Sequence, residues 1–215
     1  CVGVTTAKLW GSTMREFVTL WIVIVSMFLS NMLLAAKNDD CWHVEPYNYY
    51  PRVKIETTMG DIVVELDRRR APITVNNFLR YVDKRSYENT IFHRIVPGFV
   101  ALGGGYTDDF NGKSNFPDIF NESGNGLIND LHTIAMARQS DPHTANRQFF
   151  FNVNDNTSLN PGRDWGYAVF GVIVEGEDIV DAMSEVETEY SIRLNANNVP
   201  IEPIIIKKMT VLPPL

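Results

Sequence analysis

The segment FHRIVPGF, residues 92–99, places one arginine, Arg94, inside an apolar run that closes on the turn-forming pair Pro97-Gly98. An arginine side chain stays protonated and offers five donors in a rigid plane, so it can donate hydrogen bonds without acting as a general acid. Taken alone, an arginine in such a segment is more often an exposed strand residue. The chemistry of Arg94 therefore has to be judged from the residues around it.

Other residue types that commonly carry chemistry are scattered along the chain. The four histidines show no metal-ligand spacing and have no cysteine or glutamate arranged with them. These histidines are His43, His93, His132 and His143. The two cysteines, Cys1 and Cys41, precede the part that is patterned like a folded domain, so no disulfide framework is expected there. We expect neither a metal ion nor another cofactor.

The composition is that of an ordinary globular protein. With 215 residues, 45% of them hydrophobic, the chain is long enough for one well-buried domain. The formal net charge is −7, whereas a nucleic-acid-binding domain normally carries a basic field. We therefore expect that the protein does not bind nucleic acid; we also expect it to be a monomer. The basic run 68–70 follows Asp67 and is predicted to be a solvated turn.

An apolar run near the N-terminus is predicted to direct the protein out of the cytoplasm. Residues 17–36 carry no charge; Arg15 precedes them and Ala35-Ala36 ends them. Such a run is either a cleaved signal peptide or a retained membrane anchor. In both cases the basic side stays in the cytoplasm, so the remainder is exported, either soluble or anchored facing the periplasm.

The chain is thus interpreted as four parts. Residues 1–13 are taken as upstream sequence that is not native to the protein, and residues 14–36 as the signal peptide or membrane anchor. Residues 37–52, KNDDCWHVEPYNYYPR, are predicted to be a polar, aromatic linker. Residues 53–215 form the folded domain.

The folded part begins with a hairpin and a helix. Residues 53–58 alternate apolar and polar and are expected to pair, through a turn at Gly60, with residues 62–66. Pro72 suits the first turn of a helix. Apolar residues then recur at helical spacing, at Val75, Phe78, Leu79 and Val82.

The rest of the domain is predicted to be mainly strand. Strands are expected at TIFHRIV, FVAL, HTIAMA, QFFFNV, YAVFGVIV and PIIIKKMTVL, with a second helix at 176–186. The glycines 103–105 are expected to end the strand FVAL, and long loops to cover 106–130 and 154–166. Eight short strands and two amphipathic helices favour a mainly β fold, a closed eight-stranded antiparallel barrel capped by two α-helices.

Five segments, in this order and at these spacings, closely resemble the cyclophilins, which are peptidyl-prolyl cis-trans isomerases. The segments are FHRIVPGF, GGGYT, IAMAR, QFFFNV and YAVFG. The resemblance covers about residues 53–213, and the tyrosine of YAVFG is most like the bacterial exported, periplasmic subgroup. It implies the barrel with two helices, no cofactor, and partners that are proline-containing segments of exported proteins, whose folding the enzyme would assist.

The implied chemistry gives Arg94 a role. Rotation about an X-Pro bond costs about 18–20 kcal/mol because the amide has partial double-bond character. In the twisted transition state the proline nitrogen regains its lone pair. A donor aimed at this nitrogen stabilises the twisted amide more than either planar form. The resemblance assigns that donor to Arg94.

The resemblance also implies the substrate contacts. Positions that match the walls of the family's proline pocket are Phe99, Val100, Phe150 and Leu159. Ala137, Arg138 and Gln148 match positions that contact the substrate backbone, and at Arg138 the backbone groups are expected to serve. Without the motifs, Phe99, Val100 and Phe150 would be interpreted as barrel core and Gln148 as an ordinary edge-strand side chain.

Five positions depart from the family pattern. Leu102 stands where a glutamine is usual, Val100 replaces a methionine, Ser158 replaces an aromatic residue, Tyr167 replaces a histidine, and Arg147 replaces a serine. Leu102 matters most, because the glutamine contacts substrate and helps hold the arginine. Two functions therefore stay open: an active isomerase, or a proline-peptide binding module or holdase chaperone with weak catalysis.

Overall fold

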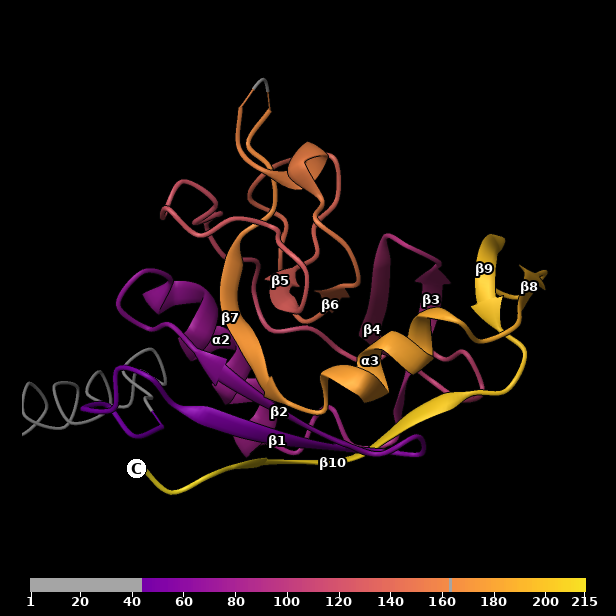
Figure 1. The fold of residues 1–215 in the computed structure, drawn as a ribbon, viewed down its shortest axis with the longest axis horizontal. Coiled ribbons are helices and arrows are strands. Elements are labelled where there is room, and N and C mark those ends of the chain that lie inside the picture. Colours follow the sequence, from indigo (N-terminus) through magenta and orange to yellow (C-terminus); the bar gives the residue numbers. More distant parts are fainter. Residues whose placement is uncertain (1–43, 163) are drawn as a thin grey trace, which may run out of the picture. The chain divides into compact units, whose positions relative to one another are not determined.

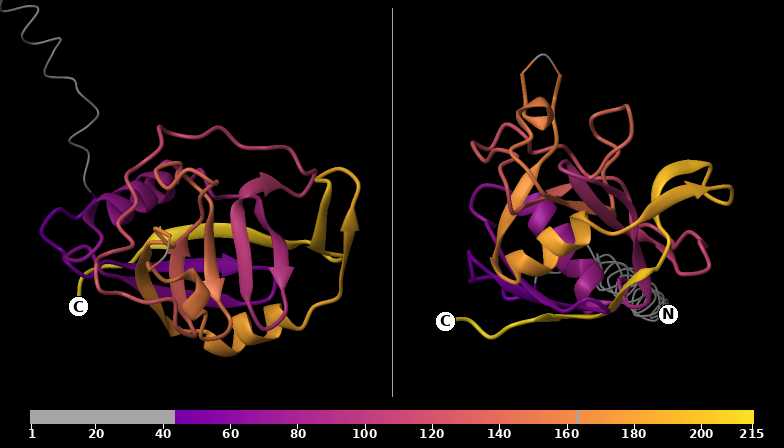
Figure 2. Two further views of the ribbon diagram at one scale, coloured as in Figure 1. Left: turned by 90° about the horizontal axis from the view of Figure 1, so that it is seen from above. Right: turned by 45° about the vertical axis from the view of Figure 1, so that its right-hand side comes forward.

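The computed structural model describes residues 44–162 and 164–215, and its centre is a closed antiparallel barrel (Figure 1). The barrel strands are β1 (Arg52–Thr57), β2 (Asp61–Leu66), β3 (Thr90–Val96), β4 (Val100–Thr107), β5 (Thr133–Met136), β6 (Phe149–Asn152), β7 (Val169–Glu175) and β10 (Ile204–Val211). Their order is β1-β10-β3-β4-β6-β5-β7-β2. The last strand, drawn in yellow, lies beside the first and closes the barrel (Figure 2). The predicted eight-stranded barrel is confirmed.

The first hairpin has the predicted alternation. Every second residue of β1 is buried, and β1 pairs on one side with β2 and on the other with β10. In the turn, the hydroxyl of Thr57 donates to the carbonyl of Gly60 at 2.7 Å. Gly60 has φ +147°, and a Cβ there would lie 2.7 Å from Cδ1 of Ile179. Glycine therefore suits both the turn and the close approach of the second helix.

Two α-helices pack against the barrel, as predicted. They are α2 (Pro72–Asp83) and α3 (Glu177–Ser184). The predicted apolar face of α2 is fully buried, and Phe78 places its ring 5.5 Å from that of Phe149 and 5.3 Å from that of Phe170. These rings fill the barrel interior. Because side chains alternate along a strand, Phe150 must face away from this interior.

The structure differs from the sequence prediction at the triple glycine. β4 does not end at residues 103–105 but continues through them to Thr107. A Cβ on Gly103 would lie 2.8 Å from the ring of Phe92, and Gly104 has φ +84°. The glycines are therefore the residues that let the strand pass a core ring closely, with a local irregularity in its pairing to β3.

A hairpin outside the barrel was not predicted. It consists of β8 (Thr188–Ser191) and β9 (Ala196–Pro200); Asn195 in the connecting turn and Asn198 within β9 both have positive φ. Its strands are short and largely polar, so neither periodicity nor hydrophobicity marks them. A short 3₁₀ helix, Thr157–Leu159, was also not predicted.

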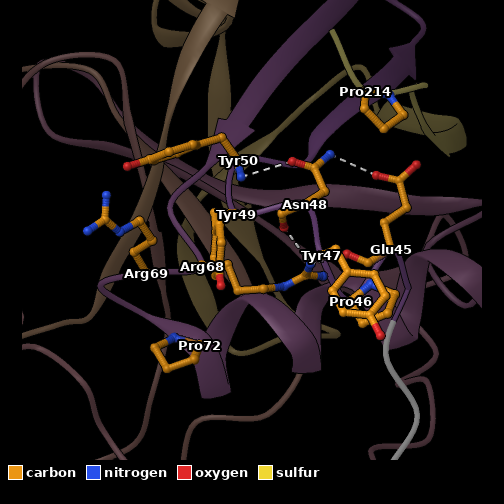
Figure 3. A pocket seen from close by; sticks show the side chains of 10 residues that line it. All are labelled: Glu45, Pro46, Tyr47, Asn48, Tyr49, Tyr50, Arg68, Arg69, Pro72 and Pro214. Carbon is orange, nitrogen blue, oxygen red and sulfur yellow. Dashed lines mark hydrogen bonds between the residues drawn. The ribbon is translucent and has the colours of Figure 1, made fainter.

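The segment before β1 is fastened to the domain by Arg68 (Figure 3). The Arg68 guanidinium donates to the carbonyls of Val44 and Asn48, each at 2.6 Å, and to that of Glu45. Arg68 is 6% exposed, so the prediction of a solvated turn is wrong for this residue, although Arg69 is exposed. The three backbone carbonyls take the place of water molecules that would otherwise accept hydrogen bonds from this guanidinium.

The same segment borders a shallow cavity of about 950 Å³. Its lining residues are Glu45, Pro46, Tyr47, Asn48, Tyr49, Tyr50, Arg68, Arg69, Pro72 and Pro214 (Figure 3). The described half of the predicted linker thus packs on the domain. The predicted upstream segment 1–13 and the signal or anchor segment 14–36 lie outside the described residues. Between residues 44 and 215, excluding residue 163, no helix is long and apolar enough to cross a membrane.

Candidate active site

A row of paired residues crosses four strands on the outer face of the barrel. Arg94 of β3 is paired with Leu102 of β4, Leu102 with Phe150 of β6, and Phe150 with Ala135 of β5. Directly paired residues point to the same face of a sheet. Since Phe150 faces away from the aromatic core, the whole row stands on the outside of the barrel.

A cavity of about 150 Å³ opens along this row. Its walls are Arg94, Phe99, Val100, Leu102, Ala137, Arg138, Phe150, Leu159 and Tyr167. These are nine of the ten residues that the sequence assigned to the site. Volumes of this order accommodate a ring the size of benzene, so the cavity has the size for one proline ring.

The floor of the cavity is apolar and its rim carries a cation. Val100 and Phe150 are 5% and 4% exposed, whereas the Arg94 side chain is exposed. The ring of Phe150 meets that of Tyr167 edge to face at 5.6 Å. The arrangement can hold a small apolar ring and present hydrogen-bond donors at its edge.

A chain of buried asparagines fixes two walls of the cavity. Asn156 Nδ2 donates to the carbonyl of Phe99 and to Oδ1 of Asn152, each at 2.7 Å. Asn152 Nδ2 donates to Oδ1 of Asn129 at 3.2 Å, and Asn129 Nδ2 donates to the carbonyl of Leu159 at 3.1 Å. The backbones that carry Phe99 and Leu159 are therefore linked through side-chain amides. Sequence reasoning missed these residues, because asparagines in loops usually indicate turns.

Arg138 forms one side of the cavity with its side chain. Its Nε donates to the carbonyl of Gly166 at 2.9 Å, and its guanidinium carbon lies 4.7 Å from the centre of the Tyr167 ring. From the sequence, only the backbone of Arg138 was expected to contribute. The side chain is a wall residue because it stacks on Tyr167 and ties that wall to its loop.

Gln148 is the one assigned residue that does not line the cavity. Its carbonyl accepts from the Ala137 N–H at 2.9 Å, so its backbone adjoins a wall residue. Its side chain instead lies over Gly105, where a Cβ would come within 2.8 Å of the amide carbon. The glycine therefore leaves space for the Gln148 amide beside the cavity rather than in it.

Arg147 is a buried cation behind the site. Only 1% exposed, it donates at 2.7 Å to the carbonyls of Gly104, Ser114 and Ser86. Its own carbonyl accepts from the Tyr87 hydroxyl at 2.7 Å. Burial lowers the pKa of Arg147, but a guanidinium stays charged in proteins. From the sequence, Arg147 was recognised only as a bulky substitution. In the structure, its hydrogen bonds connect β4 with the loops that contain Ser86 and Ser114.

His93 is buried, whereas its neighbour Arg94 in β3 is exposed. His93 is 7% exposed, with its ring 4.8 Å from that of Tyr106. Burial lowers the pKa of His93 to about 4, so the ring is neutral at pH 7. In the described part of the chain, no three histidine, cysteine, aspartate or glutamate side chains are grouped to hold a metal ion.

Comparison with known proteins identifies the family. The family model described as cyclophilin type peptidyl-prolyl cis-trans isomerase/CLD matches residues 52–211. The chain is 47% identical over 164 residues to peptidyl-prolyl cis-trans isomerase cyp18 of Streptomyces antibioticus, an alignment that covers 74% of this chain and 98% of the relative. It is 44% identical to peptidyl-prolyl cis-trans isomerase B of Escherichia coli K12, again covering 74% and 98%.

Solved structures agree with this assignment. The crystal structure of a Cryptosporidium parvum cyclophilin type peptidyl-prolyl cis-trans isomerase superposes with a TM-score of 0.61 at 27% identity, covering 78% of this chain and 100% of that one. A crystal structure of that protein in the presence of the dipeptide Ala-Pro gives a TM-score of 0.59, with 76% and 99% covered. The chain therefore belongs to the cyclophilin-type peptidyl-prolyl cis-trans isomerases and is close to those of bacteria.

Proposed function

We propose that this isomerase acts on X-Pro bonds of exported proteins and that Arg94 is its catalytic residue. The observation that supports this proposal is the row in which Arg94 pairs with Leu102 and Leu102 pairs with Phe150, because it places a cation at the rim of a cavity with an apolar floor. A proline ring held on Phe150 brings its nitrogen to the rim where Arg94 stands. The substrate is a proline-containing polypeptide segment.

The mechanism requires no covalent chemistry. Rotation about the X-Pro bond breaks no σ-bond, so neither a nucleophile nor a proton acceptor takes part. As the amide twists, its nitrogen becomes pyramidal and gains hydrogen-bond acceptor strength. The guanidinium of Arg94 then donates to that nitrogen, a bond that the planar amide does not offer, and this differential binding lowers the barrier.

Export is proposed from the sequence alone. The apolar run 17–36 follows Lys8 and Arg15 and precedes Asp39 and Asp40, which orients the domain away from the cytoplasm. In a bacterial cell the domain then works in the periplasm on chains that have just crossed the membrane. Labelling of Lys54 by a reagent that does not penetrate intact cells, with no labelling of a cytoplasmic control protein, supports this location; protection of Lys54 in intact cells contradicts it.

Leu102 favours a second candidate function. A leucine opposite Arg94 adds apolar contact for a client but no hydrogen bond that orients the guanidinium. A lost hydrogen bond near a charged group is worth roughly 1.5–3 kcal/mol, or about one to two decades in rate. Apolar contact with a client, combined with a poorly oriented guanidinium, is what we would expect of a proline-peptide binding module or holdase with weak catalysis.

One paired measurement separates the two functions. The full chain is assayed for turnover of an Ala-Pro tetrapeptide, and binding of the same peptide is measured by titration. An isomerase accelerates cis–trans exchange at catalytic concentrations of the protein. A binding module saturates with peptide while exchange rises only slightly above the uncatalysed rate; exchange at the uncatalysed rate would overturn the proposed assignment of Arg94.

A further inference from the structure

Three aromatic rings stand in a row on loops beside the cavity: Phe120, His143 and Trp165. The centre of the His143 ring lies 5.3 Å from that of Phe120 and 4.8 Å from that of Trp165, edge to face in both cases. Phe120 and Trp165 are nevertheless 69% and 54% exposed. Grouped apolar rings that remain exposed on a folded protein mark a surface used for binding.

Hydrogen bonds fasten the loops that carry this aromatic row. The Ile119 N–H donates to the carbonyl of Ala145 at 2.8 Å in an isolated β-bridge, which sets Phe120 beside the His143 loop. The Asn121 N–H donates to Nδ1 of His143 at 3.2 Å, and Nδ2 of Asn121 donates to the carbonyl of Gly166 at 3.0 Å. Asn121 thus connects all three loops.

The same region is anchored to the helix α2 and to the Trp165 backbone. The carboxylate of Glu122 accepts from the N–H of Ile73 at 3.1 Å and from the N–H of Thr74 at 2.7 Å. The hydroxyl of Ser123 donates to the carbonyl of Trp165. Rings on such fastened loops lose little conformational entropy when they bind a ligand.

The aromatic row continues the wall of the proline cavity. The carbonyl of Gly166 accepts from Asn121 and also from Nε of Arg138, which lines the cavity. Trp165 precedes Tyr167, another wall residue, by two positions. The loop between β6 and β7, which carries both, projects from the barrel in Figure 1, drawn in orange. An extended client chain advances about 3.3 Å per residue, so a side chain a few residues from a bound proline is separated from it by a distance on the scale of these loops.

We propose that the aromatic row is a second subsite for the polypeptide whose proline occupies the cavity, and that it receives a bulky apolar side chain a few residues from that proline. The inference rests on the proposed function and names a preference within it. Because Nδ1 of His143 accepts a hydrogen bond, its neutral ring carries the proton on Nε2 and can donate to a client carbonyl. Phe120 and Trp165 supply the apolar contact.

The test is a position scan on peptides that contain one Ala-Pro bond. Phenylalanine is placed in turn at each of four positions before and after the pair, with alanine elsewhere, and kcat/KM is compared with the all-alanine peptide. We expect one position to raise kcat/KM by about five- to tenfold in the wild-type chain. Trp165→Ala and Phe120→Ala should each remove that gain. Tyr190→Ala, a change at a similarly exposed ring on β8, should retain it.

A second readout observes binding in the wild-type sequence, so its result does not depend on the folding of an alanine variant. The full chain is labelled with 5-fluorotryptophan, and the Trp165 resonance is assigned by Trp165→Phe. The preferred phenylalanine peptide should shift this resonance, whereas its alanine counterpart should not. A flat position scan in the wild type, a gain that survives both variants, or an unmoved Trp165 resonance overturns the subsite. Absence of turnover on every Ala-Pro peptide instead overturns the proposed function, and titration of each phenylalanine peptide against the Trp165 resonance then still decides whether the row binds.

Discussion

Arg94 on β3 and Leu102 on β4 are direct partners in the antiparallel ladder, and both line the cavity on the outer face of the barrel. Leucine has neither a donor nor an acceptor, so the residue opposite the guanidinium cannot orient it by a hydrogen bond. The orientation of Arg94 then depends on its backbone register and on the substrate. This relationship makes the two residues the most informative positions for mutation.

Replacement of Arg94 by alanine should remove most of the turnover and leave the fold intact. The side chain is exposed and acts mainly on the twisted amide, so kcat/KM should fall by at least about tenfold, or 1.4 kcal/mol. Arg94→Lys should recover only part of the loss, because an ammonium lacks the planar set of donors. Turnover of an Ala-Pro peptide and a thermal melt measure the two properties. An alanine variant with unchanged kcat/KM would exclude Arg94 from the mechanism.

Leu102→Gln should raise the activity. The amide would give Arg94 a hydrogen-bonding partner directly across the ladder and could also contact a substrate carbonyl. Leucine contributes apolar contact that planar and twisted substrate share equally, which affects KM but not kcat. We expect kcat/KM to rise several-fold while binding of a ground-state peptide changes little. If turnover stays flat in a folded variant, another residue already supplies the hydrogen bond, and Gln148→Ala would test Gln148, which directly precedes β6.

Arg68 and Arg69 form a matched pair for testing the N-terminal clamp. Arg68 is buried under three carbonyls of residues 44–48, whereas its neighbour Arg69 is exposed. Arg68→Ala should lower the free energy of unfolding by about 2–3 kcal/mol, since hydrogen bonds to a charged donor are lost. Arg69→Ala should change it by less than about 0.5 kcal/mol. Urea unfolding of both variants measures the difference; equal effects would mean that the clamp contributes no stability.

Acid should destabilise the domain through His93. The pKa of His93 is lowered by burial to about 4 in the folded protein, against an ordinary value of 6.5. The unfolded chain therefore binds the extra proton first, and the stability contribution that is complete above pH 6.5 is lost as the pH falls toward 4. The loss amounts to about 3 kcal/mol. Urea unfolding between pH 7 and pH 4 should show a shallower decline for His93→Phe than for the wild type. Parallel declines would contradict this role.

Much of the fold could be predicted because its signals are local. The alternation in residues 53–58 and the helical spacing from Val75 to Val82 each specify a buried face, and both faces are buried in the structure. The hairpin of β8 and β9 gave no such signal, since its short strands are mostly polar and stand outside the core. Local patterns specify an element only where one of its faces is buried.

The cavity could be assigned from motifs, but its supports could not. Nine assigned residues meet at one cavity because they lie on paired strands and on loops that their motifs mark. The guanidinium groups of the buried residues Arg68 and Arg147 donate hydrogen bonds to carbonyls of distant segments. Because every residue has a backbone carbonyl, the sequence does not indicate which carbonyls will accept these bonds. The asparagine chain that includes Asn129 and Asn156 escaped notice for the same reason. Polar residues of loops show a structural role only when their partners are known.

The Arg68 clamp also has a mechanical consequence. A pull on the chain from its N-terminal side reaches the carbonyls of Val44, Glu45 and Asn48 before it reaches β1. Force is therefore carried into the turn after β2, where Arg68 sits, while the hydrogen bonds of β1 to β2 and β10 remain unloaded. Tension applied from the N-terminal side would first detach residues 44–51, which precede β1. The barrel and the cavity on its outer face would keep their shape until that segment had detached.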